Sequence, residues 1–110
     1  MTDDRTFSAE LIEADGEVVV ALIGDLDLAA RDRFHGVFED VRATAKPVAL
    51  DVSRLSFADS TGIGCLCYAR NAVFENSGRP PRLIGARPWL RQLLSLSGID
   101  DLFDLSDATS

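Results

Sequence analysis

A short apolar segment between two helix-like segments constrains the fold more than any other feature of this chain. Residues 48–52 (VALDV) are mostly apolar and follow Pro47, a residue that ends any preceding helix. A run of this composition is typical of a strand in the middle of a sheet. Because helical patterns lie on both sides of it in the sequence, it predicts parallel strand pairing with right-handed crossovers. The chain is therefore expected to build a sheet that helices cover.

The N-terminal region predicts an antiparallel hairpin. Apolar and polar residues alternate over residues 7–11, which is the pattern of a half-buried strand, and residues 17–23 are almost entirely apolar. The Asp-Gly pair at residues 15–16 is typical of a tight turn between two such strands. Two more short strands are expected, at residues 82–85 and at residues 102–103. The sheet would thus combine antiparallel and parallel pairs.

Three segments have the spacing of helices that bury one face. Residues 28–44 repeat apolar side chains three and four positions apart, and a second segment begins at Ser60, after a predicted loop over residues 53–58. A third begins at Pro88 and ends near Gly98. The order β-β-α-β-α-β-α, with a brief final β, predicts an α/β fold. We expect a small mixed β-sheet, with an initial antiparallel hairpin and then parallel βαβ units, and helices packed on it.

Length and charge restrict the number of domains and the kinds of partner. The 110 residues suit one compact domain spanning 1–110, with 46% hydrophobic and 26% charged residues. Eighteen acidic residues against eleven basic ones argue against binding to nucleic acid or to an anionic membrane. The longest apolar run, residues 18–23, is far shorter than the roughly 20 residues of a membrane helix, and no signal-peptide pattern precedes it. The protein is therefore expected in the cytoplasm.

The cysteines, the single histidine and the paired glycines do not form a metal or cofactor motif. Cys65 and Cys67 lie two positions apart, where helix side chains point in nearly opposite directions, so reduced thiols are expected. Together with His35 they lack the spacing of zinc ligands. Gly62 and Gly64 open a helix, but neither the third glycine of a dinucleotide loop nor a Walker lysine follows. No metal and no cofactor is expected.

Few residues are available for catalysis. The only histidine is His35, and the G-x-S-x-G pattern of a nucleophile elbow is absent, so the sequence predicts no catalytic residue. A small hydrolase that uses Ser60 and His35 is the alternative from the enzyme class. Such an enzyme would be labelled on Ser60 by an electrophilic serine probe.

Ser60 has two interpretations that the residues alone leave open. It lies between Asp59 and Thr61, where the second helix begins. As an N-cap, its hydroxyl would accept a hydrogen bond from an early helix N–H, which is worth about 1 kcal/mol. As a phosphoacceptor, it would carry a phosphate of about -1.5 to -2 charges at the positive end of the helix dipole. Nearby Asp side chains would then make the surface strongly repulsive to an acidic or apolar partner.

A motif around Ser60 resembles the signature of a known family. Residues 50–64 (LDVSRLSFADSTGIG) combine a short strand, a loop and the sequence D-S-[ST]-G-[LI]-G at a helix start. Residues 24–27 (GDLD) resemble the G-[ED]-[LI]-D element after the second strand, and residues 83–103 resemble the last strand-helix-strand portion. The chain is therefore similar to the STAS domain family, and within it to bacterial anti-anti-sigma factors (anti-sigma factor antagonists).

This resemblance implies a switch protein rather than an enzyme. The unphosphorylated form would bind an anti-sigma factor that is also an ATP-dependent serine kinase, and would thereby release the sigma factor. Phosphorylation of Ser60 would end that binding, and a PP2C-type phosphatase would restore it. By position in the motifs, the resemblance implies a partner-binding surface made of Asp25, Asp27, Asp59, Ser60, Thr61, Gly62, Ile63 and Gly64.

Several alternatives accompany these implications. STAS domains also serve as non-phosphorylated interaction modules in stress-signalling or lipid-transport assemblies, which is the alternative function. Gly62 and Gly64, without side chains, would leave a kinase unobstructed, whereas Ile63 has a core position as its alternative. The family usually ends with another amphipathic helix, but residues 104–110 stop where it would start. That helix is therefore expected to be missing or truncated after residue 105.

Overall fold

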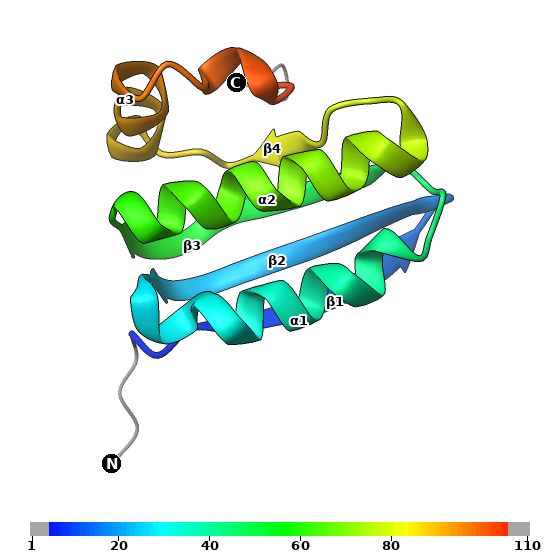
Figure 1. Cartoon of the computed structure of the whole chain (residues 1–110), viewed down its shortest axis with the longest axis horizontal. Helices are drawn as coiled ribbons and strands as arrows, with labels where there is room; N and C mark the ends of the chain where they lie inside the picture. The colour runs from blue at the N-terminus through cyan, green and yellow to red at the C-terminus, as the bar shows by residue number, and fades with distance from the viewer. Residues whose placement is uncertain (1–4, 106–110) are drawn as a thin grey trace.

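The chain forms a sheet with helices packed against it, in the order that the hydrophobic pattern predicts. Residues 5–105 are described by the computed structural model shown in Figure 1. The elements are β1 (Ser8–Ala14), β2 (Glu17–Leu26), the 3-10 helix η1 (Leu28–Ala30), α1 (Arg31–Arg42), β3 (Val48–Ala58), α2 (Ser60–Ser77), β4 (Arg82–Ile84), α3 (Pro88–Leu96) and the 3-10 helix η2 (Asp100–Leu102).

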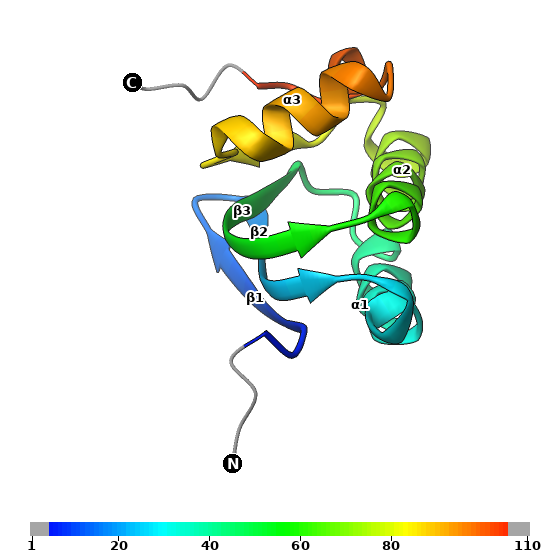
Figure 2. The ribbon, with the colours of Figure 1, turned by 90° about the vertical axis from the view of Figure 1, so that its left-hand side faces the viewer.

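The sheet confirms the predicted mixture of antiparallel and parallel pairs. Its strand order is β1-β2-β3-β4, in which β1 is antiparallel to β2 and the other neighbouring pairs are parallel. Asp15 and Gly16 have positive φ angles and form the turn of the hairpin, as predicted. Helices α1 and α2 lie together on one face of the sheet, whereas α3 lies apart from them (Figure 1 and Figure 2). The fold is thus the expected α/β arrangement.

The face of the sheet that α1 and α2 cover forms the core. In β2 the alternating residues Val18, Val20 and Leu22 are buried, as a strand with one covered face requires. Phe34 and Phe38 of α1 are fully buried and stack with their ring centroids 4.7 Å apart. Burying an apolar side chain of this size stabilises the folded state by about 1.5–3 kcal/mol. This core holds α1 and α2 against the sheet and so positions their first turns.

The three predicted helices are confirmed, with one adjustment. Residues 28–44 are divided into η1 and α1 rather than forming a single helix. Helix α2 begins at Ser60 and is followed by Gly78, whose left-handed backbone (φ 74°) ends it. Pro88 is the first residue of α3, where its fixed φ angle suits the helix and its missing N–H is not needed.

Two strands run further than the sequence predicted. Strand β2 extends three residues beyond the predicted end, to Leu26, and β3 extends to Ala58, so the predicted loop over residues 53–58 is wrong. The pairing of the two strands continues through this stretch and joins Asp25 to Phe57 and Leu26 to Ala58. Polar residues occur here because alternate side chains of a strand point away from the core.

The predicted final strand is also wrong. Residues 100–102 form η2, and Phe103 is buried in the core. Asp104 instead pairs with β4, through a parallel bridge to Arg82. Two adjacent apolar residues are too few to show a period, so the sequence pattern could not distinguish a short strand from a single apolar side chain that is buried in the core. The prediction about a final helix concerns residues 106–110, which lie outside the described residues.

Candidate functional site

The predicted carboxylates gather at the carboxyl ends of β2 and β3. Asp25 lies near the end of β2, and Asp27 follows as the N-cap of η1, where its Oδ1 accepts a hydrogen bond from the N–H of Ala30 at 3.2 Å. Asp59 directly follows β3. Because β2 and β3 are parallel and paired up to their last residues, these carboxylates share one edge of the sheet. Strand ends of this kind are where open α/β sheets place binding sites.

Asp59, and not Ser60, caps α2. Its Oδ1 accepts a hydrogen bond from the N–H of Gly62 at 3.0 Å, and its backbone is extended, as is usual for an N-cap. Ser60 is the exposed first residue of the helix, so the interpretation of Ser60 as the cap is wrong. Within residues 5–105 the hydroxyl of Ser60 forms no hydrogen bond, which leaves it available to a reaction partner.

Replacing Asp59 is expected to weaken the start of α2. Asp59→Ala removes the oxygen that accepts the Gly62 N–H, so the free energy of unfolding should fall by about 1 kcal/mol. Urea denaturation followed by circular dichroism measures this change. Asp59→Asn keeps an acceptor oxygen and should leave stability almost unchanged. A larger loss from Ser60→Ala than from Asp59→Ala would contradict the assignment of the cap.

The two glycines of the motif have different structural roles. Gly62 is buried, and a Cβ built on it would lie 2.2 Å from the carbonyl oxygen of Leu26 and 3.1 Å from the Cβ of Ala58. Glycine at this position lets α2 pack directly against the end of β2. The structure therefore gives Gly62 a packing role, and its contact with a partner stays a prediction. Gly64 is exposed and has no neighbouring atom within 4 Å of its Cβ position, so it leaves open space through which another protein can reach the start of α2.

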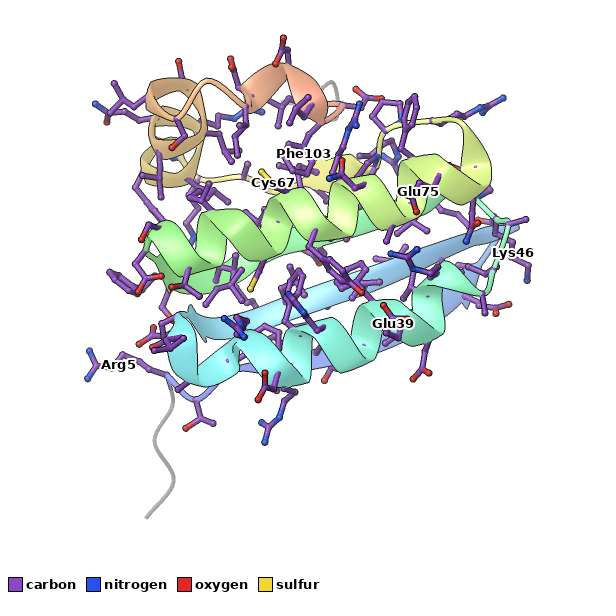
Figure 3. All side chains as sticks on the ribbon, in the orientation of Figure 1. Arg5, Glu39, Lys46, Cys67, Glu75 and Phe103 are labelled. Atoms are coloured by element: carbon purple, nitrogen blue, oxygen red, sulfur yellow. The ribbon has the colours of Figure 1, made fainter. Side chains whose placement is uncertain are left out.

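A cavity of about 220 Å³ lies next to the carboxylates. Arg5 and Arg33 line it together with Asp25 and Asp27, so its walls carry both signs of charge. Nη1 of Arg33 donates to the carbonyl oxygen of Phe7 at 2.8 Å, which holds the N-terminal segment in place, and Figure 3 shows Arg5 at this end of the molecule. Oδ1 of Asp25 is buried and has no hydrogen-bond partner among the described residues. A buried carboxylate oxygen without a donor favours contact with a donor from outside the chain.

Two exposed apolar side chains at this edge were not predicted from the sequence. Leu28, the first residue of η1, is 68% exposed, and Phe57, which pairs with Asp25, is 47% exposed. Large apolar side chains exposed beside polar groups are typical of contact surfaces. The sequence could have indicated Leu28, because this apolar residue directly follows Asp27. It could not have indicated Phe57, because the contact of Phe57 with this edge depends on the strand that residues 53–58 were not predicted to form.

A second cavity, of about 330 Å³, lies between α1 and α2, and we call it the interhelical groove. His35 of α1 stacks on Tyr68 of α2, with ring centroids 4.1 Å apart and 15° between the rings. Thr61 lines the groove but Ser60 does not, so the structure does not place Ser60 and His35 in one cavity as a hydrolase would require. Ile63 is half-buried and packs against the core, so it is not wholly a core residue, and its contact with a partner stays a prediction. The groove is lined by Arg31, His35, Thr61, Gly64, Cys65 and Tyr68.

Within residues 5–105, no group of three or more His, Cys, Asp or Glu side chains is arranged to hold a metal ion. Over the same residues, none of the helices has the length and hydropathy needed to cross a membrane. Cys65 is buried, Cys67 is half-buried, and both are free thiols, as their spacing predicts.

Comparison with known proteins assigns the chain to a family. The sequence model of the family described as "Mlab, STAS domain" matches residues 10–105. The chain therefore belongs to the STAS domain family. A STAS-domain containing protein from Pseudomonas aeruginosa is 30% identical to it over 98 residues, which are 87% of this chain and 95% of that protein.

Solved structures with the same fold include anti-sigma factor antagonists. An anti-sigma factor antagonist from Mycobacterium paratuberculosis matches with a TM-score of 0.81 at 21% identity, over 98% of this chain and 95% of the other. The Bacillus cell fate determinant SpoIIAA in its phosphorylated form matches with a TM-score of 0.65 at 24% identity, over 89% of this chain and 88% of the other. At these identities the likeness shows the fold, and the fold agrees with the family that the motif predicted.

Proposed function

We propose that this protein is an anti-sigma factor antagonist that is switched by phosphorylation of Ser60. Its unphosphorylated form binds an anti-sigma factor that is also a serine kinase, and this binding releases the sigma factor. Phosphorylation ends the binding, and a PP2C-type phosphatase restores it. The observation that carries the proposal is the exposed hydroxyl of Ser60, which is free of hydrogen bonds among the described residues because Asp59 caps the helix. The switch operates in the cytoplasm, where ATP and sigma factors are present.

The reaction requires Ser60 to be a nucleophile that the kinase can reach. Its Oγ forms a bond to the γ-phosphorus of the ATP that the kinase holds. The bond from that phosphorus to the β–γ bridging oxygen breaks, ADP leaves, and the serine proton passes to a base of the kinase. The exposure of Ser60 and the open space at Gly64, one turn further along α2, support this access.

The phosphate changes the charge of the surface without requiring a change of fold. It carries about -1.5 to -2 charges at pH 7. The carboxylates of Asp25, Asp27 and Asp59 lie at the same edge of the sheet, so the phosphate adds to a surface that is already acidic. Asp59 continues to cap α2, and the start of the helix need not reorganise. A docked partner loses affinity through repulsion and through the cost of removing water from the phosphate.

Leu28 and Phe57 supply the apolar part of the proposed partner surface. Both side chains are largely exposed, and they border the carboxylates of the same sheet edge. Oδ1 of Asp25, buried without a donor among the described residues, is suited to accept a hydrogen bond from the partner. These features fit a partner surface that combines an apolar pocket with basic side chains.

Phosphosite mass spectrometry of the protein isolated from its own cells tests the switch. We expect a phosphoryl group on Ser60 that is removed by a PP2C-type phosphatase. A strain that carries Ser60→Ala is the control, because it shows whether neighbouring hydroxyls such as those of Thr61 and Ser56 are modified instead. Unmodified Ser60 under every growth condition would overturn the proposal.

A non-phosphorylated interaction module in a larger complex, such as a stress-signalling or lipid-transport assembly, is the second candidate function. The exposure of Leu28 and Phe57 favours it, because an apolar contact surface can hold a permanent partner without a switch. A protein of this kind would copurify with its complex whether or not ATP is added, and Ser60→Asp would leave the complex intact.

A further inference from the structure

The interhelical groove opens beside the first turn of α2. Thr61, Gly64 and Cys65 line it from α2, at positions three and four residues apart that share one helix face. Arg31 and His35 line it from the first turns of α1. Because Gly64 has no side chain and no neighbouring atom within 4 Å of its Cβ position, the groove has open space next to Thr61. Its volume of about 330 Å³ has room for a group much larger than a water molecule.

Arg31 is the cation of this groove. It is exposed at the first position of α1, and among the described residues its guanidinium forms no hydrogen bond or ion pair. By contrast, Arg33 two residues later donates to a backbone carbonyl. Burial raises the pKa of the Cys65 thiol, whereas the charge of Arg31 lowers it and that of Asp59 raises it. Arg31 and Asp59 therefore act on the same thiol, from α1 and from the start of α2.

We propose that the interhelical groove is a receptor for a phosphoryl group carried by the first turn of α2, with Arg31 as its charged residue. The proposal rests on the proposed function, because it concerns where the phosphate lies after the transfer. A guanidinium presents its N–H donors in a planar fork that matches the oxygens of a phosphate. The phosphate is carried by Ser60 or by Thr61, of which Thr61 itself lines the groove and Ser60 immediately precedes it.

A receptor in the groove gives the phosphate a favourable position in an acidic environment. The first turn of α2 lies beside the sheet edge that carries Asp25, Asp27 and Asp59, and these like charges disfavour the dianion of a phosphate there. An arginine that also faces the phosphate offsets this by forming new charge-assisted hydrogen bonds, while the charge of the phosphate still adds to the acidic surface. The ring nitrogens of His35 form no hydrogen bond with any described residue and offer a further donor, while the ring is held by its stacking on Tyr68. In the phosphorylated protein, the phosphate thus has one defined position, in the interhelical groove between α1 and α2.

Phosphorus NMR of site-specifically phosphorylated protein tests the receptor. Two full-length proteins are produced, one with phosphate on Ser60 and one with phosphate on Thr61, and the apparent pKa of each phosphate is measured by titration. We expect Arg31→Gln to raise this pKa by about 0.5 unit or more in at least one of them, because the guanidinium favours the dianion. Arg87→Gln is the matched control, since Arg87 is exposed at the N-cap of α3, on an element outside the groove.

Each outcome of this titration decides the proposal. A shift for the phosphate on Ser60 identifies the phosphate of the proposed switch as the ligand. A shift confined to Thr61 identifies the phosphate of that residue instead. Equal pKa values with and without Arg31 in both proteins would overturn the receptor. The measurement needs no kinase and no partner, so its failure leaves the proposed switch standing, whereas the absence of Ser60 phosphorylation in cells removes the switch without changing the measured shift.

Discussion

Gly62→Ala is expected to destabilise the protein by about 3 kcal/mol, because the new methyl group overpacks the contact between α2 and the sheet. Its Cβ would lie 2.2 Å from the carbonyl oxygen of Leu26, a backbone atom that no rotamer change can move. The first turn of α2 would have to shift away from β2, and buried contacts such as those of Leu66 would be lost. Urea denaturation measures the effect as a lower midpoint of unfolding.

Gly64→Ala is the matched control for this substitution. It lies two residues further along the same helix and has open space at its Cβ position. Replacing a glycine inside a helix by alanine stabilises the helix by up to about 1 kcal/mol, so the two variants should change stability in opposite directions. Equal effects of Gly62→Ala and Gly64→Ala would contradict the close packing of α2 on the end of β2.

Phosphorylation of Ser60 is expected to weaken binding to the proposed kinase partner by roughly two to three orders of magnitude, which corresponds to about 3 to 4 kcal/mol. The phosphate adds its charge to an edge that already carries Asp25, Asp27 and Asp59, and a docked partner would have to desolvate it. Ser60→Asp places a smaller charge at the same position and should weaken binding in the same direction. Isothermal titration calorimetry with the purified partner measures both changes.

The alanine variant separates the switch from a merely structural role of this serine. Ser60→Ala should keep the fold and the affinity, because Asp59 supplies the cap, but ATP should no longer dissociate its complex. Ser97→Asp adds an equal charge at the exposed C-cap of α3 and should leave affinity unchanged. Full affinity of Ser60→Asp, in a complex that ATP does not dissociate, would instead identify the protein as a non-phosphorylated interaction module.

The hydrophobic pattern predicted the elements in which one face is buried along the whole length. The apolar run in β2 and the helical spacing in α1 correspond to the buried residues Val20, Leu22, Phe34 and Phe38. Periodicity failed where burial depends on a neighbour that is distant in sequence. The second half of β3 is a strand because it pairs with the end of β2, and the polar residues of this half could not reveal that partner.

The motif predicted where the site residues lie in the fold, but it did not predict which of them caps the helix and which packs against the sheet. Asp25, Asp27 and Asp59 do share one edge of the sheet with Ser60, as parallel strand ends require. The cap was assigned to the wrong residue because aspartate and serine are about equally good N-caps, and only the backbone geometry chooses between neighbours. The motif also did not reveal the packing role of Gly62, because the carbonyl oxygen of Leu26 that lies beside it belongs to a strand distant in sequence.

The sequence by itself determined the order of strands and helices, the mixed sheet and the edge at which the acidic motif lies, because each follows from local periodicity and from the handedness of crossovers. Tertiary structure alone decided which hydroxyl stays free, which glycine is buried, and how Arg31 and Thr61 come to line one groove. These properties depend on contacts between residues far apart in the chain. Such contacts arise only when the core brings α1 and α2 together on the sheet.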